Sequence, residues 1–119
     1  MSFPTYKPGV IVSAPANGDV AAKRFVGYDD AQVASAGAEA KGVTIDGADD
    51  GKELAIIISG TALVTSGAAI SVGASLASDA NGKAVTAVAT NKILGVAVTA
   101  AAGADEDIEI DLKAHPTAA

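Results

Sequence analysis

The residues with the clearest potential for chemistry are acidic, and they lie in two short runs. Residues 46–53 read Asp-Gly-Ala-Asp-Asp-Gly-Lys-Glu, and residues 105–107 read Asp-Glu-Asp. A calcium loop of the EF-hand type needs oxygen ligands at positions that include the first, third, fifth and twelfth. With Asp46 as the first position of such a loop, the third position is Ala48 and the twelfth is Ile57, and neither side chain has an oxygen. We therefore interpret both runs as solvated loops and predict no metal site.

Residue types for nucleophilic and imidazole chemistry are scarce. The chain has no cysteine, which excludes a disulfide scaffold, a thiol nucleophile and a thiolate metal site. His115 is the only histidine, so a zinc site or a histidine-based triad has too few imidazoles. We interpret it as an exposed residue of the tail. No glycine-rich nucleotide loop and no G-x-S-x-G elbow occurs. The sequence predicts no enzyme and no cofactor.

Composition limits the partners and the size of the core. The 119 residues carry 8 basic and 14 acidic side chains, a formal charge of −6, which argues against a nucleic-acid binder. Half of the residues are hydrophobic but only 3% are aromatic, so much of the apolar content is alanine. This length fits one domain, or at most two very small ones. We expect a thin core that is stabilised further by neighbouring subunits.

Short β-branched runs bounded by glycine and serine predict an all-β, mainly β fold, a small β-sandwich or barrel-like domain. Asn81-Gly82, within residues 79–83, is a strong hairpin signal. Residues 31–41 allow one short helix, although Gly37 interrupts them. The predicted strands are residues 24–28, 42–45, 53–58, 61–64, 70–72, 84–88, 93–98 and 108–112.

One uncharged stretch, residues 54–78, is 25 residues long and would suffice to span a bilayer. Serine, threonine and glycine interrupt it throughout, so we interpret it as buried strands joined by turns and predict no membrane partner. The first residues show no apolar signal segment, and we expect synthesis and action from the cytoplasm.

We expect an extended N-terminal arm over residues 1–19, a β domain over residues 20–113 and a flexible C-terminal tail over residues 114–119. The arm holds three of the four prolines and two of the four aromatic residues, Phe3 and Tyr6. Two interpretations stay open: a disordered terminus, or an extended segment that docks on a partner through its rings.

A weak repeat runs through the β domain. Gly42-Val43-Thr44-Ile45 corresponds to Gly95-Val96-Ala97-Val98, and in both copies a small or acidic loop and then an apolar strand follow. Upstream, Val26-Gly27 corresponds loosely to Val72-Gly73. The pattern predicts two weakly similar β units packed as one domain.

Glycine and turn motifs recur in an order that resembles the capsid cement, or head decoration, proteins of tailed bacteriophages. The resemblance covers roughly residues 18–112. The motifs are Gly-Thr-Ala-Leu-Val at 60–64, the segments 67–76, 78–85 and 93–97, and upstream the segments 22–29 and 40–43.

The resemblance implies a virion protein, made in the host cytoplasm, that binds the outer surface of an expanded capsid. Its partner would be the major capsid protein, whose subunits it would cement without chemistry. It would be a homo-oligomer, with a trimer favoured over a dimer. Such proteins often contact the capsid through an N-terminal arm. The candidate partner-binding residues are Phe3, Pro4, Thr5, Tyr6, Lys7 and Pro8.

A second function class also fits a small all-β domain. A β-sandwich or barrel binding module would recognise a surface or a carbohydrate without catalysis. Such a module needs exposed aromatic rings in a groove, and this chain has only four aromatic residues, two of them in the arm.

Overall fold

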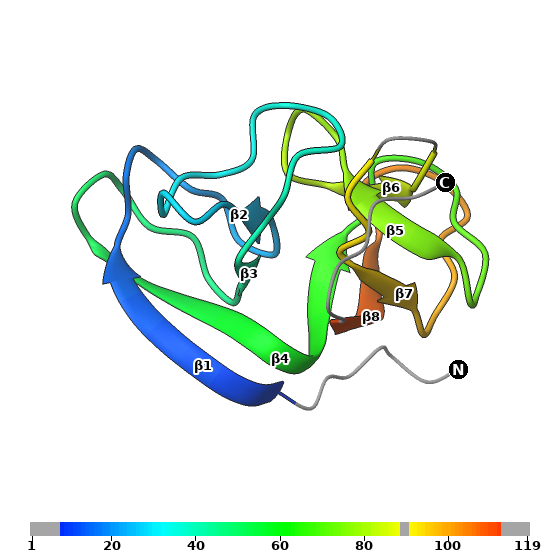
Figure 1. Cartoon of the computed structure of the whole chain (residues 1–119), viewed down its shortest axis with the longest axis horizontal. Helices are drawn as coiled ribbons and strands as arrows, with labels where there is room; N and C mark the ends of the chain where they lie inside the picture. The colour runs from blue at the N-terminus through cyan, green and yellow to red at the C-terminus, as the bar shows by residue number, and fades with distance from the viewer. Residues whose placement is uncertain (1–7, 89–90, 113–119) are drawn as a thin grey trace.

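The computed structural model describes residues 8–88 and 91–112, which form eight strands and no helix. The all-β prediction is confirmed. The strands are β1 (Pro8–Pro15), β2 (Phe25–Val26), β3 (Gly42–Thr44), β4 (Glu53–Thr65), β5 (Ser75–Ser78), β6 (Ala84–Thr86), β7 (Gly95–Ala97) and β8 (Asp107–Leu112), as Figure 1 shows.

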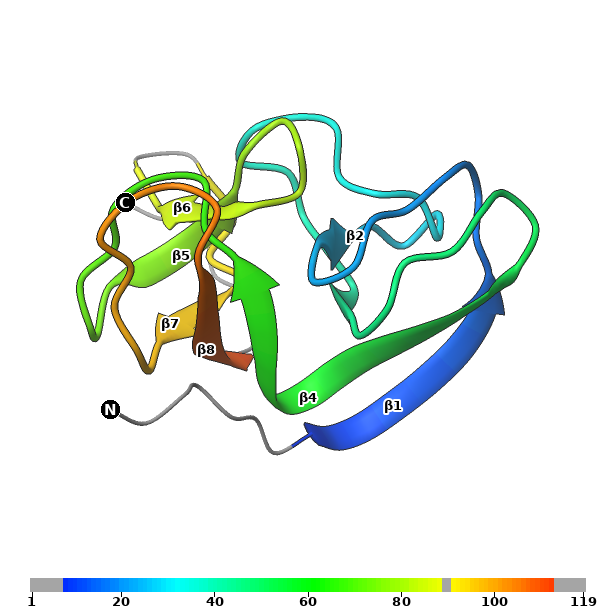
Figure 2. The same ribbon diagram turned by 180° about the vertical axis from the view of Figure 1, so that it is seen from behind.

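Every strand pair is antiparallel, and the strands make one nearly closed, barrel-like sheet in the order β2-β3-β4-β8-β7-β5-β6. The two ends of this path meet, because the N–H of Phe25 in β2 donates to the carbonyl of Gly82 in the β5–β6 hairpin (2.8 Å). β1 lies outside the path and pairs with β4. Figure 2 shows β1 and β4 side by side from behind.

Strand β4 holds the sheet together because it bends in its middle. Before Gly60 it pairs with β1 and β3, and after Gly60 it pairs with β8. Gly60 has a φ of 85°, a backbone conformation that residues other than glycine rarely adopt. The predicted strands 53–58 and 61–64 are therefore one bent strand, visible in Figure 1.

The chain on either side of this bend repeats one hydrogen-bonding pattern. Val20 and Ala48 exchange two N–H···O bonds (2.8 and 2.9 Å), and Ile70 and Ala101 do the same (2.9 and 2.9 Å). The ladders of β2–β3 and β3–β4 match those of β5–β7 and β7–β8, and the β1–β4 ladder matches β4–β8. We call residues 8–59 the first half and residues 61–112 the second half. In this alignment of the two halves, Val26 is equivalent to Leu76 and not to Val72.

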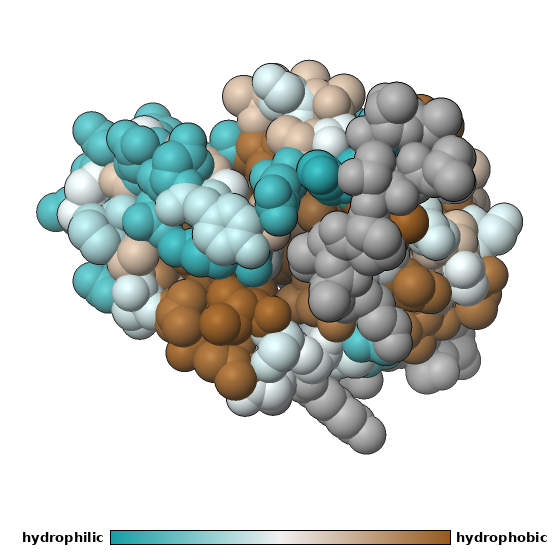
Figure 3. Space-filling view, in the orientation of Figure 1, coloured by the Kyte–Doolittle hydropathy of each residue, from teal (hydrophilic) through white to brown (hydrophobic). Residues whose placement is uncertain are grey.

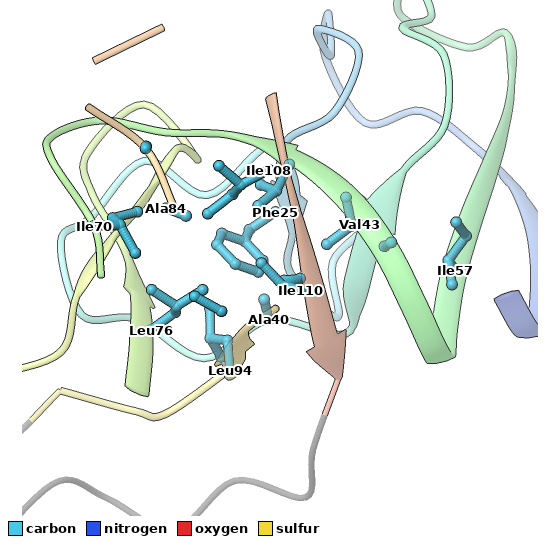
Figure 4. Packing of buried hydrophobic residues seen from close by; sticks show 14 of the residues in the cluster. Phe25, Ala40, Val43, Ile57, Ile70, Leu76, Ala84, Leu94, Ile108 and Ile110 are labelled. Carbon is cyan, nitrogen blue, oxygen red and sulfur yellow. The ribbon is translucent and has the colours of Figure 1, made fainter. Parts of the chain in front are cut away.

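The main core lies inside the barrel-like sheet. Phe25 is fully buried, and Figure 4 shows its ring among Ile108, Ile110, Leu76 and Leu94. A smaller cluster packs in the first half. It consists of Ala16, Val20, Val26, Leu54 and Ile56, with Val12 and Ala48 against it.

Two local expectations differ from the structure. Residues 31–41 form a loop instead of the short helix, because their main chain bonds to neighbouring segments. The N–H of Gly37, which has a φ of 76°, donates to Ser78 (2.8 Å) and that of Lys41 to Val26 (2.7 Å). Residues 70–72 form only the isolated pair at Ile70, and Val72 is 65% exposed.

Candidate binding surface

The predicted partner-binding residues lie at and before the start of β1. Phe3, Pro4, Thr5, Tyr6 and Lys7 fall outside the described residues. Pro8 opens β1 and lies opposite Gly60 of β4. The described part of the arm, residues 8–15, is thus a strand of the chain's own sheet, and it leads directly from the predicted contact residues into the fold.

The alternation of hydrogen bonds shows which side of β1 remains open. The N–H of Ala16 donates to Lys52 (2.9 Å), and the N–H of Gly51 donates to Ala16 (2.8 Å). The ladder keeps one register from Ile11 to Pro15 and shifts between Pro8 and Ile11. Because bonding direction alternates along the regular part of an antiparallel strand, the N–H and C=O groups of Ile11 and Ser13 point away from β4. Within residues 8–88 and 91–112, no strand pairs with that side of β1. Among the described residues it is a free sheet edge, of the kind that proteins usually protect.

An apolar surface lies beside this edge. Val10 and Ile11 are each 48% exposed, and Ile58 of β4 is 37% exposed. We call these three residues the β1 patch. Figure 3 shows a hydrophobic area over the β1–β4 ladder. No charged residue occurs between Pro8 and Pro15. The edge therefore lacks the lysines that commonly prevent a sheet edge from pairing with another chain.

The Pro15 end of β1 is acidic instead. Glu53, which is exposed, lies opposite Pro15. The carboxylate of Asp19 accepts the N–H of Asp50 (3.0 Å), and the carboxylate of Asp50 accepts the N–H of Gly18 (2.9 Å). Lys52 is the cation beside them in the sequence. The free edge thus runs from an uncharged end to an end with excess negative charge.

One ion pair joins the two halves, and another lies within the second half. Lys23 of the first half pairs with Asp107 of the second (3.1 Å), and Lys83 pairs with Asp105 (2.5 Å). The hydrogen bond and the charge of Lys83, with a smaller contribution from Arg24, hold the pKa of the Asp105 carboxyl below its ordinary value. These side chains are engaged in holding loops together.

A small cavity of about 190 Å³ lies near the bend of β4. Two of its polar groups are used by the fold, because the Thr44 hydroxyl donates to the carbonyl of Ala21 (2.9 Å) and the Lys23 ammonium pairs with Asp107. The cavity is lined by Lys23, Thr44, Ile45, Asp46, Ile57 and Leu63.

By composition the acidic runs could hold a metal and the uncharged stretch could span a membrane, but the described residues form neither a metal-binding cluster nor a membrane-spanning helix. In the described part of the chain, no three histidine or acidic side chains come together as metal ligands. Nor do residues 8–88 and 91–112 contain a helix of the length and hydropathy needed to cross a bilayer. Residues 54–78 instead supply most of β4, a turn and β5.

Comparison with known proteins identifies the family of this small barrel-like domain. The family model for phage cement protein matches residues 6–112, so the chain belongs to the phage cement protein family. The resemblance found in the sequence is confirmed. The protein is a structural, capsid-associated protein of phage virions.

A solved structure shares the fold. It is the head fiber gp8.5 N base in bacteriophage phi29, which matches with a TM-score of 0.72 and 23% sequence identity. The match covers 87% of this chain and 93% of that one. No curated protein matched the sequence.

Strand β1 and the open edge that it forms were not predicted from the sequence. Val10-Ile11-Val12 is a β-branched run between Pro8 and Pro15, which is typical of a strand at the edge of a sheet. That signal was present in the arm, but the run gives no indication of its partner, β4.

Proposed function

We propose that this protein binds the outer surface of the expanded capsid and cements neighbouring major capsid subunits. The match of the cement family over residues 6–112 carries the proposal. The formal charge of −6 suits the outside of the shell rather than the side that faces DNA. The protein acts by binding alone and performs no chemistry.

The contact with the capsid begins at the N-terminal arm, through Phe3, Pro4, Thr5, Tyr6, Lys7 and Pro8. Large rings supply contact area at a low cost in conformational entropy, and they are frequent at the centres of interfaces. The protein acts as a homo-oligomer, a trimer in preference to a dimer. An oligomer that bridges several capsid subunits gains avidity from many individually weak contacts.

Co-sedimentation with phage heads tests this function. The purified protein, made from its gene in host cells, is mixed with expanded heads stripped of decoration, and unexpanded proheads serve as the control. Saturable binding to expanded heads alone is expected. Absence of binding to either particle contradicts the proposed function. Analytical ultracentrifugation of the free protein gives the number of copies in the oligomer.

The alternative, a binding module for a surface or carbohydrate, has less support. Phe25 is buried in the core, and Tyr28, 66% exposed, is the one exposed aromatic among the described residues. Carbohydrate-type stacking needs several rings along a groove, so we favour the capsid as the partner.

A further inference from the structure

We propose that the free edge of β1 takes up an extended segment of the capsid protein as an additional strand of this protein's sheet. This inference rests on the proposed function and names the part of the folded domain that meets the capsid. Strand addition of this kind gains affinity from main-chain hydrogen bonds and specificity from flanking side chains.

The main chain of β1 is available for this pairing. Ile11 and Ser13 each direct one N–H and one C=O away from β4, so the edge offers two donors and two acceptors. Pro15 also faces outward, and it has no N–H to leave unpaired. The register of the β1–β4 ladder shifts between Pro8 and Val10 and again between Val10 and Ile11, so the regular stretch that accepts a strand runs from Ile11 to Pro15.

The second half of the molecule covers one position of the equivalent edge with its own chain. Thr65 occupies the place in the β4–β8 ladder that Pro15 occupies in the β1–β4 ladder. The outward N–H of Thr65 donates to the carbonyl of Lys23 (3.0 Å), so a main-chain segment from the first half covers this position. At the corresponding place in the first half Pro15 has no N–H, and the N–H of Asn17 donates to the carbonyl of Asp30 (3.0 Å), so the part of this edge open to a segment from outside the chain is Ile11 to Pro15.

The surroundings of the edge specify the chemistry of the segment. The β1 patch offers uncharged apolar surface near the middle of the strand, which favours β-branched or other apolar side chains. The acidic side chains of Glu53, Asp19 and Asp50 favour a lysine or arginine where the segment passes Pro15. A second copy of this chain, whose own β1 is uncharged, is the other occupant, and the oligomeric state of the variants below distinguishes it from a capsid segment.

A proline substitution at Ser13 tests the edge directly. Ser13→Pro removes an outward N–H without removing a bond to β4, whereas Ser13→Ala keeps that N–H and is the matched control. In co-sedimentation with expanded heads, Ser13→Pro should weaken binding about tenfold or more, and Ser13→Ala should bind like the parent protein. Circular dichroism and ultracentrifugation establish that both variants keep the fold and the oligomeric state.

Two further substitutions address the side chains. Ile11→Lys places a charge in the β1 patch and should weaken binding as Ser13→Pro does. Glu53→Gln should weaken binding less, and it should reduce the loss of binding caused by added salt.

Three outcomes overturn the inference. Unchanged binding of folded Ser13→Pro and Ile11→Lys excludes the β1 edge as the contact, while the cement function stands. Dissociation of the free oligomer by Ser13→Pro assigns the edge to a second copy instead. Failure of the parent protein to bind heads removes the proposed function itself, and the inference with it.

Discussion

Gly42 of β3 lies so close to the carbonyl oxygen of Ile57 in β4 that a β-carbon on Gly42 would overlap with it. The equivalent residue of the second half, Gly95, has the same relation to Asp111, where a β-carbon would lie 2.7 Å from the carbonyl oxygen. The glycines of the repeated Gly-Val pair therefore permit a close approach of neighbouring strands.

Gly42→Ala should lower the free energy of unfolding by about 3 kcal/mol, the upper end of the usual cost of overpacking, because backbone atoms rather than a flexible side chain must move. Urea denaturation measures the change. Gly103→Ala is the control, since a β-carbon there meets open space and should change stability by less than about 0.5 kcal/mol. Equal stability of the two variants would contradict the close approach.

The direction of the hydrogen bonds along β1 predicts losses of stability of different size for neighbouring prolines. The N–H of Ala14 points toward β4, opposite Leu54. Ala14→Pro should therefore remove a ladder bond and lower the free energy of unfolding by about 1–3 kcal/mol. Ser13→Pro should lower it by less than about 1 kcal/mol, because that N–H points away from the sheet. Thermal melts of both variants give the comparison, and a larger loss for Ser13→Pro would mean that the assignment of the free edge is wrong.

The ion pair between Lys83 and Asp105 predicts a specific pH dependence. Lys83 lowers the pKa of Asp105 below 3.8, so the stabilisation by this carboxylate is complete above about pH 5 and is lost as the pH falls through the lowered value. Asp105→Asn removes the charge and retains a residue type that tolerates the φ of 65° at this position.

Urea denaturation of Asp105→Asn and the parent protein at several pH values checks this dependence. The parent protein should be the more stable near neutral pH, and the two should converge in acid. Lys83→Met should move the NMR-detected titration of Asp105 upward toward 3.8. An unchanged titration in that variant would show that Lys83 is not the cause of the shift.

The strands with local signals were predictable from the sequence. The alternation in 108–112 gives β8, and Asn81-Gly82 gives the β5–β6 hairpin, in which the N–H of Asp79 donates to Lys83 (2.8 Å). Gly82 takes a φ of 74° there, the conformation for which a glycine after asparagine is suited.

Elements fixed by distant partners were not predictable in the same way. β5, Ser75–Ser78, is made of residues with little preference for strands and forms because β6 and β7 flank it. β1 pairs with residues 38 to 52 positions later, from Pro15 with Glu53 to Pro8 with Gly60, so its proline-bounded sequence is compatible with a free arm as well as with a strand. The free edge follows only from knowing on which side β4 lies.

The position of β1 also determines how the predicted arm must be tested. Removal of residues 1–17 would delete β1 and expose the small cluster around Leu54 and Ile56, so lost binding would report unfolding as well as lost contact. Removal of residues 1–7 leaves the whole β1–β4 ladder in place. This deletion should preserve the circular dichroism spectrum and weaken binding to expanded heads about tenfold or more, because it removes both rings of the arm. Phe3→Ala with Tyr6→Ala in the full chain should reproduce most of the loss. If the shortened protein binds with wild-type affinity, the arm is not needed and the folded domain makes the entire capsid contact.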